Sequence, residues 1–251
     1  MTPSTALGAI AHVGRYGLLL AQAFRSVHEW RTYRANLFVQ AVRIGIDSLP
    51  IVVVAAAFSG AVTTLQTAYQ FVSGLVPKSV IGSIVTESVI LELAPVISAL
   101  VLAGRVGARI AAELGTMRVT EQIDALEVMG LNAVSFLVLP RVLAGVLMFP
   151  VLITAAAVVG IAGGIVAGVT SGELPAAEFL VGARSFFKPF DVTFMLTKAV
   201  TFGFLVSSIS CYQGYYASGG AEGVGRATTR AAVISCITVL LADYILAALL
   251  L

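Results

Sequence analysis

Four charged side chains interrupt long apolar stretches of this sequence: Glu87, Glu92, Lys198 and Asp243. If those stretches lie in a membrane, each charge near its centre costs about 2.5–3.5 kcal/mol, so such side chains are usually paired or functional. A lysine there can neutralise one or two of the acids. The residues alone leave two interpretations open: a static ion cluster, or a network whose pairing changes as the protein works.

The composition supports a membrane location for these stretches. The chain has 251 residues, of which 59% are hydrophobic and 11% are charged. Soluble domains carry about 25% charged residues, so this chain has too little charge to cover a surface that faces water. An outer-membrane barrel is excluded, because its strands would be about ten residues of alternating polarity. The sequence therefore predicts an all-α integral membrane protein.

Five apolar stretches are long enough to cross a membrane. A helix needs about 20 apolar residues to span the hydrocarbon layer. The predicted crossings are about 48–72, 79–104, 142–170, 192–212 and 231–251.

The first 43 residues differ from the rest. Their apolar patch at 6–24 is interrupted by His12 and Arg15, and further arginines follow it. A secretory signal has its basic residues before the apolar part. An amphipathic helix in the membrane interface fits better than a signal or a sixth crossing. We therefore expect an interfacial region over 1–43 and a membrane domain over 44–251.

Basic residues give the orientation. With a cytoplasmic N-terminus and alternating crossings, eleven of the fifteen Lys and Arg residues lie inside, as the positive-inside rule requires. The C-terminus is then outside, and the four intramembrane charges lie in the outer half. Glu87 and Glu92 point about 140° apart on a helix, so both cannot face one partner. Pro95, one turn after Glu92, could bend this crossing.

A polar island, ELGTMRVTEQIDAL at 113–126, faces the cytoplasm between the second and third crossings. Thr120 can cap a short helix there and Gly130 can end it. Such a helix is too short to be stable alone in water, so it packs on its own protein or docks on a soluble partner. Its apolar residues at i, i+4 and i+7 share one face: Val119, Ile123 and Leu126.

Nothing in the sequence indicates catalysis. No lysine follows a glycine, so the chain has no phosphate-binding P-loop, and the glycine-rich segment 219–230 lacks both a lysine and a preceding strand. His12 and His28 lie in the interfacial region, and Cys211 and Cys236 lack the spacing of metal ligands. We expect no catalytic residue, no metal and no cofactor in this chain, and no nucleic-acid partner.

Three segments carry a resemblance to a known family: ELAPVISALVLAGRVGARIAAELGTMRVTEQIDALEVMG (92–130), LPRVLAG (139–145) and GVGRATTRAAV (223–233). They resemble the MlaE (YrbE) permeases, the membrane subunits of ABC-type lipid transporters associated with MCE proteins. The resemblance runs from about residue 35 to the end, so 44–251 is expected to be an MlaE-type permease domain.

The resemblance implies a non-enzymatic subunit in a bacterial inner membrane. Its implied partners are a second copy of the chain, two cytoplasmic ABC ATPases that bind ATP and Mg, an extracytoplasmic MCE-domain (MlaD-like) hexamer and, in many members, a STAS-domain (MlaB-like) protein. The implied substrate is phospholipid, moved between the inner membrane and the MCE protein. This transport would support outer-membrane lipid asymmetry or envelope lipid supply.

The resemblance also implies roles for residues. The island would be the coupling helix in a groove of the ATPase, formed by Met117, Arg118, Val119, Glu121, Gln122, Ile123, Asp124, Leu126 and Glu127. Glu92, Lys198 and Asp243 stand where the family carries the same charges. Leu91 departs from the family pattern, which commonly has an arginine there, so an extra charge pairing cannot be assumed.

A stripe in the first crossing is a candidate lipid contact. Its spacing of i, i+3, i+4 and i+7 places four residues on one face: Val62, Leu65, Gln66 and Tyr69. The resemblance implies a substrate cavity at the dimer interface, formed by the first and fifth crossings, and ordinary helix packing is the competing account. In the third crossing, Gly160, Gly164 and Gly168 permit close helix approach.

Arg105 and Arg109, at i and i+4 near the cytoplasmic end of the second crossing, could hold lipid phosphates, although the positive-inside bias alone explains them.

Two other functions remain open from the residues. A secondary carrier could use Glu92, Lys198 and Asp243 as a proton or ion relay, but such carriers often show internal repeats and none is evident. A structural anchor for an MCE ring is the other alternative.

Overall fold

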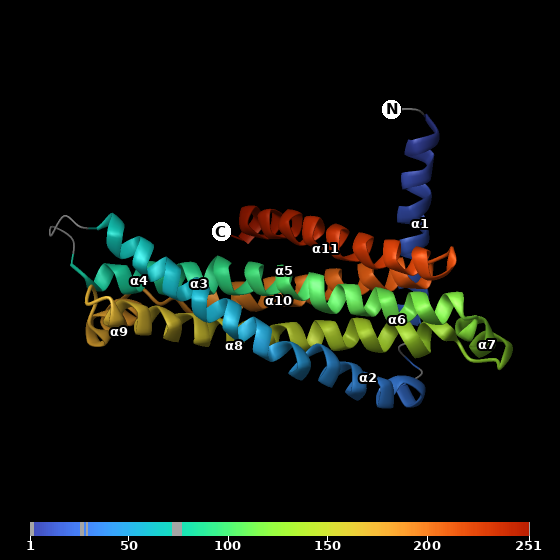
Figure 1. Ribbon diagram of the computed structural model, residues 1–251, viewed down its shortest axis with the longest axis horizontal. Coiled ribbons are helices and arrows are strands. Elements are labelled where there is room, and N and C mark those ends of the chain that lie inside the picture. Colours follow the sequence, from blue (N-terminus) through green and yellow to red (C-terminus); the bar gives the residue numbers. More distant parts are fainter. Residues whose placement is uncertain (1–2, 26–27, 29, 72–76, 251) are drawn as a thin grey trace.

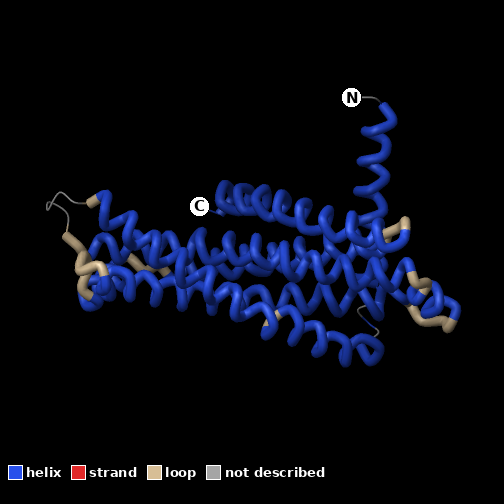
Figure 2. Tube along the Cα trace, viewed as in Figure 1, coloured by secondary structure: helices blue, strands red, loops and turns tan. Residues whose placement is uncertain are grey.

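The computed structural model describes residues 3–25, 28, 30–71 and 77–250, and all regular elements in this part of the chain are helical (Figures 1 and 2). They are α1 (Pro3–Arg25), α2 (Trp30–Ile44), η2 (Ile46–Ser48), α3 (Leu49–Gln70), α4 (Ser79–Ser88), η3 (Val89–Ile97), α5 (Ser98–Leu102), η4 (Ala103–Gly107), α6 (Ala108–Val119), α7 (Gln122–Val128), η5 (Val134–Val138), α8 (Leu139–Thr170), α9 (Ala176–Ser185), α10 (Pro189–Tyr215) and α11 (Gly220–Leu250). η2 is a 3₁₀ turn, whereas η3, η4 and η5 are π-helical.

Five helical stretches of the described chain are long and apolar enough to cross a membrane: Tyr33–Gln70, Ser79–Val119, Val134–Thr170, Pro189–Tyr215 and Gly220–Leu250. The prediction of five crossings in an all-α membrane protein is therefore confirmed. The helices extend beyond the apolar cores read from the sequence. The second has 41 residues, which is about 60 Å of helix at 1.5 Å per residue, roughly twice the hydrocarbon thickness. Its ends therefore project from the apolar layer.

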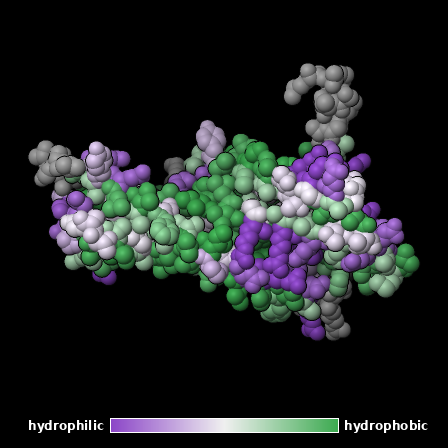
Figure 3. Space-filling view, viewed as in Figure 1, coloured by the Kyte–Doolittle hydropathy of each residue, from purple (hydrophilic) through white to green (hydrophobic). Residues whose placement is uncertain are grey.

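The spans lie lengthwise side by side, with α9 at one end of the bundle and α7 at the other (Figure 1). We call these the α9 end and the α7 end. α8 packs against α3 and α10, and α10 also contacts α6 and α11, while α9 packs on α4. Apolar surface covers most of the middle of the bundle, where one hydrophilic patch interrupts it, and polar surface also lies toward the ends (Figure 3). This distribution is typical of a bundle whose middle faces lipid chains.

α1 stands away from the bundle at the α7 end (Figure 1) and is not among the five spanning stretches. Two polar contacts fix it to α10: Tyr16 and Ser208 share a hydrogen bond of 2.7 Å, and His12 Nδ1 lies 2.8 Å from the Tyr212 hydroxyl. Burial raises the pKa of the Tyr16 phenol, so this group stays protonated. α1 is thus not a sixth span by length and composition, and its interfacial location stays a prediction.

Glycines set the close approach of α3 and α8. A Cβ atom on Gly60 would overlap the carbonyl oxygen of Gly160, and one on Gly163 would overlap the carbonyl oxygen of Ala57. Thr64 donates to the Gly60 carbonyl at 3.0 Å, within this interface. Small residues let the two backbones meet, which in a membrane supplies packing that the hydrophobic effect does not.

Substitution of Gly60 tests this interface. We expect Gly60→Ala to destabilise the chain by roughly 1–3 kcal/mol, because the new methyl group overpacks a backbone contact. Thermal unfolding of the purified chain in one detergent measures the change. The matched control is Gly104→Ala, where the new Cβ meets no atom within 4 Å. The control should be neutral or slightly stabilising, and equal melting of both variants would contradict the packing assignment.

Candidate functional site

Lys198 on α10 is completely buried, at 0% exposure, and oxygen atoms surround its ammonium group. Nζ lies 2.7 Å from Glu92 Oε1 and 2.7 Å from Asp243 Oδ1, and it donates to the Leu91 carbonyl oxygen at 3.0 Å. It also lies 4.6 Å from the centre of the Phe194 ring. The cluster therefore joins η3, α10 and α11 at one point inside the bundle.

The Leu91 carbonyl lies in the segment that contains Pro95, whose missing N–H removes one backbone donor from this turn. Lys198 supplies a donor to that oxygen. The backbone around Leu91 and Pro95 is the π-helical segment η3, a distortion that is frequent at functional sites. The sequence predicted a disturbance beside Glu92, and it takes this form.

The two acids of the cluster differ in environment. The Glu92 side chain is 45% exposed, whereas Asp243 Oδ1 is buried and makes no hydrogen bond within the described chain. The ion pair with Lys198 is therefore the compensation for the buried Asp243 oxygen. Two carboxylates against one ammonium leave an excess negative charge, and Glu92 presents it toward the outside of the chain.

Glu87 lies outside this cluster. No hydrogen bond or ion pair joins Glu87 to another residue of the described chain, and it lines a separate small hollow together with Asp191. Because Glu87 and Glu92 point to different sides of the helix, only Glu92 reaches Lys198. The structure thus brings together three of the four charges that the sequence singled out.

The polar island contains the predicted short helix, α7, but the predicted start of that helix and the predicted role of Val119 are wrong. α6 ends at Val119, Glu121 adopts a left-handed conformation with φ 61°, and α7 starts after it. Thr120 does not cap α7, because its hydroxyl donates back to the Thr116 carbonyl at 2.8 Å. Val119 therefore belongs to α6 and does not share a helical face with the apolar residues of α7. We call this break the elbow.

Several contacts attach α7 to the rest of the chain. Ile123 is fully buried and Leu126 packs partly buried against the core. Arg118, before the elbow, pairs with Asp124 at 2.7 Å, after it. These contacts hold a seven-residue helix that would not be stable alone, and they link its position to that of α6.

The C-terminal end of α7 presents apolar side chains that the sequence interpretation missed. Val128 is 89% exposed and Met129 is 66% exposed. Gly130, at φ 77°, then ends the helix as predicted. An apolar pair directly before a terminating glycine was the available signal, but apolar residues near a helix end are usually read as core. Glu127, one residue earlier, accepts a hydrogen bond from Tyr215 at 3.1 Å.

The α3 stripe is exposed in this chain. All four members, Val62, Leu65, Gln66 and Tyr69, face away from the described core. They are therefore available to lipid or to a second copy, whereas packing inside one chain does not account for them.

The fold and site define a class: an all-α, multi-pass membrane protein with a buried ion cluster. Within the described residues, no three His, Cys, Asp or Glu side chains gather as a metal site.

The family follows from comparison with known proteins. A family model described as Permease MlaE matches residues 37–249, and the chain belongs to this family of ABC transporter permeases. It is 41% identical to a probable ABC transporter permease protein of Rickettsia bellii (strain RML369-C), over 93% of this chain and 90% of the relative. It is 38% identical to a probable ABC transporter permease protein of Synechocystis sp., over 91% and 86%. It is also 34% identical to Protein TRIGALACTOSYLDIACYLGLYCEROL 1, chloroplastic, of Arabidopsis thaliana, over 92% and 64%.

The burial of the Lys198 cluster predicts how substitutions in it change the free energy of unfolding. Lys198→Met leaves two carboxylates without their cation, and removal of one partner of a buried pair costs about 3–5 kcal/mol. Adding Glu92→Gln and Asp243→Asn should restore most of this loss. Denaturant or thermal unfolding in lipid nanodiscs measures both. Lys188→Met, at an exposed lysine, is the control and should change little. If Lys198→Met alone were as stable as the wild type, the cluster would not be required for the stability of the fold.

Proposed function

We propose that this chain is the permease subunit of an ATP-driven transporter that moves phospholipids between the inner membrane and an extracytoplasmic MCE protein. The transport would serve outer-membrane lipid asymmetry or envelope lipid supply. The family match supports the permease role, and the name of the Arabidopsis relative is that of a lipid. The chain would be non-catalytic, since it lacks a P-loop, and a separate ATPase would bind ATP and Mg.

The proposed assembly contains two copies of this chain, two cytoplasmic ABC ATPases and an MCE-domain hexamer, with a STAS-domain subunit as a further candidate. In this assembly the N-terminus and the α7 end are cytoplasmic and the C-terminus is periplasmic. The positive-inside bias supports the orientation. The exposed α3 stripe and the exposed apolar side chains of α11 support a partner copy or a lipid cavity beside these helices.

The main structural support for the proposal is the position of the elbow and of α7, which suit the docking of a soluble ATPase. α7 lies at the end of the bundle (Figure 1), is fixed to α6 by the Arg118–Asp124 pair, and exposes Val128 and Met129. A soluble ATPase that moves α7 would therefore move α6. α6 belongs to the same span as η4, α5 and η3. Along this span, Glu92 of η3 lies about 30 Å from Glu113 of α6, at 1.5 Å per residue. Displacement can reach the Lys198 cluster through one span.

Val128→Asp tests the docking surface. Because the Val128 side chain makes little contact with its own chain, the substitution should leave the melting temperature unchanged. It should reduce ATPase retention on co-purification, and lipid-stimulated ATP hydrolysis, by about tenfold or more, since apolar contacts at the centre of an interface dominate binding. Val181→Asp, at an exposed valine of α9 at the opposite end, is the control. Normal ATPase binding and hydrolysis by Val128→Asp would assign the docking site elsewhere.

A triple variant of the ion cluster distinguishes a structural role of its charges from a role in the transport cycle. In the triple variant Glu92→Gln, Lys198→Met and Asp243→Asn, the fold is expected to be retained, because no uncompensated charge remains. If the charges take part in the cycle, lipid transfer by the reconstituted complex falls at least about tenfold while ATPase binding persists. Unchanged transfer identifies a static cluster. Lipid transfer by the wild-type chain without any ATPase would instead favour the secondary carrier.

A further inference from the structure

A polar hollow and an apolar groove lie next to each other where α10 ends and α11 begins, near the α7 end of the bundle (Figure 1). The volume of the hollow is about 230 Å³ and that of the groove is about 370 Å³. A water molecule takes up about 30 Å³, so the hollow has room for roughly seven groups of that size and the groove for roughly twelve. Both spaces can therefore hold part of an organic ligand.

The hollow carries excess positive charge. Its polar lining consists of Gln213, Tyr216, Ser218, Arg226 and Arg230. Arg226 pairs with Glu222 at 2.9 Å on the exposed surface. Arg230 is exposed and makes no ion pair or hydrogen bond with any residue of the described chain. The guanidinium group of Arg230 therefore has unused donors at a space large enough for a ligand.

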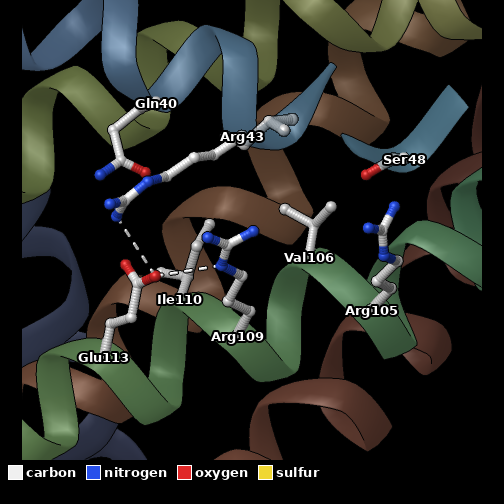
Figure 4. Close-up of a pocket in the computed structure, with 9 residues that line it drawn as sticks. Gln40, Arg43, Ser48, Arg105, Val106, Arg109, Ile110 and Glu113 are labelled. Carbon is white, nitrogen blue, oxygen red and sulfur yellow. Dashed lines mark hydrogen bonds and ion pairs between the residues drawn. The ribbon is translucent and has the colours of Figure 1, made fainter. Parts of the chain in front are cut away.

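Three other arginines near this end differ from Arg230, because an acid of the chain compensates them. Glu113 lies 3.5 Å from Arg43 and 3.0 Å from Arg109 (Figure 4), and it lies 3.2 Å from Arg141. The space beside these residues is about 10 Å³, which is room for about one water molecule. A lipid phosphate at Arg109, one of the interpretations left open by the sequence, has no space there.

The groove is mostly apolar and lies between α1, α10 and α11. Its apolar lining includes Val13, Leu205, Ile209 and Ile234. The two hydrogen bonds that fix α1 to α10, made by His12 and Tyr16, form one edge of it. Val13 is 71% exposed, so the α1 wall presents an apolar side chain that the chain itself does not cover.

The hollow continues into the groove, because Gln213 lines both. On α11 the lining residues follow one another at steps of four: Arg226 and Arg230 at the hollow, then Ile234 and Thr238 at the groove. On α10 the lining changes in the same direction from Tyr216 through Gln213 to Ile209 and Leu205. Both helices therefore change from polar to apolar from the end of the bundle toward its middle. Arg230 and Thr238 are about 12 Å apart along α11.

This order of groups matches a phospholipid that lies in one leaflet. Guanidinium groups bind phosphate particularly well, and an acyl chain lies in the apolar layer. The positive-inside bias alone would place an arginine at this end, but it does not require an apolar groove beside that arginine. We propose that the hollow and the groove together bind one phospholipid, with its phosphate at Arg230 and one acyl chain in the groove. This site is separate from the α3 stripe and does not depend on the proposed transport.

Native mass spectrometry of the full-length, delipidated chain tests the proposal. The probes are phosphatidylglycerol, diacylglycerol with the same acyl chains, and glycerol 3-phosphate. We expect Arg230→Gln to weaken phosphatidylglycerol binding by about tenfold, since it removes a charge-assisted contact. Ile234→Trp, whose larger side chain fills the groove, should weaken it to a similar extent. Diacylglycerol and glycerol 3-phosphate should each bind at least about tenfold more weakly than phosphatidylglycerol, because each lacks one part of the ligand.

Two matched controls accompany these variants. Arg184→Gln changes an exposed arginine of α9 at the opposite end, and Val158→Trp changes a valine of α8 that is 63% exposed. Neither residue lines the hollow or the groove, so both controls should bind phosphatidylglycerol as the wild type does. Arg230→Gln should also melt as the wild type does, because Arg230 has no partner in the described chain to lose.

Several results would overturn the proposal. They are unaltered binding by Arg230→Gln or Ile234→Trp, an equal loss in the controls, or binding of either partial ligand as strong as that of phosphatidylglycerol. If Ile234→Trp changed the oligomeric state and left lipid binding intact, the groove would be a contact between copies of the chain. The measurement uses the chain without ATP or an ATPase. Lipid binding by a chain whose reconstituted complex transports no lipid would therefore contradict the proposed function and leave this site standing.

Discussion

Lys198 places a positive charge where water does not reach it, and three helices supply the oxygen atoms that its ammonium group requires. Desolvation of an ion costs several kcal/mol, so these oxygens must stay close in any stable arrangement of the bundle. The constraint explains why α11 keeps an aspartate in an apolar helix. Helices α10 and α11 and the second span therefore move together or exchange partners at this point.

The second span connects this cluster to a second group of charges at the α7 end. Glu92 and Glu113 belong to one continuous helical stretch, and the helix between them is long enough to cross the hydrocarbon layer. At the first cluster, two acids face one lysine. At the second, the arginines Arg43, Arg109 and Arg141 outnumber the acids Glu113 and Asp47. The second cluster limits the depth of the span, because its half-exposed Arg43 and Arg109 cannot enter the apolar layer without losing hydration.

Much of this arrangement could be predicted from sequence. Long apolar runs specify the five spans, and the rarity of charge within them singles out Glu92, Lys198 and Asp243. The elbow could not be predicted, because a non-glycine residue such as Glu121 rarely adopts a positive φ and does so here under the tertiary contacts of α7. Hydropathy also could not give the helix lengths, since a helix continues past the apolar layer when it packs on a neighbour. The sharing of Glu113 by Arg43, Arg109 and Arg141 becomes visible only once α2, α6 and α8 are placed side by side.

Leu91 contributes to the cluster through its backbone rather than its side chain. Lys198 donates to the Leu91 carbonyl, so the interaction does not depend on the side chain at this position. A cationic side chain there would cancel the excess negative charge of the cluster. With leucine, the charge remains on a half-exposed Glu92. The Glu92 carboxylate therefore faces the outside of the chain on one side of Lys198, while Asp243 holds the same ammonium group from within the bundle.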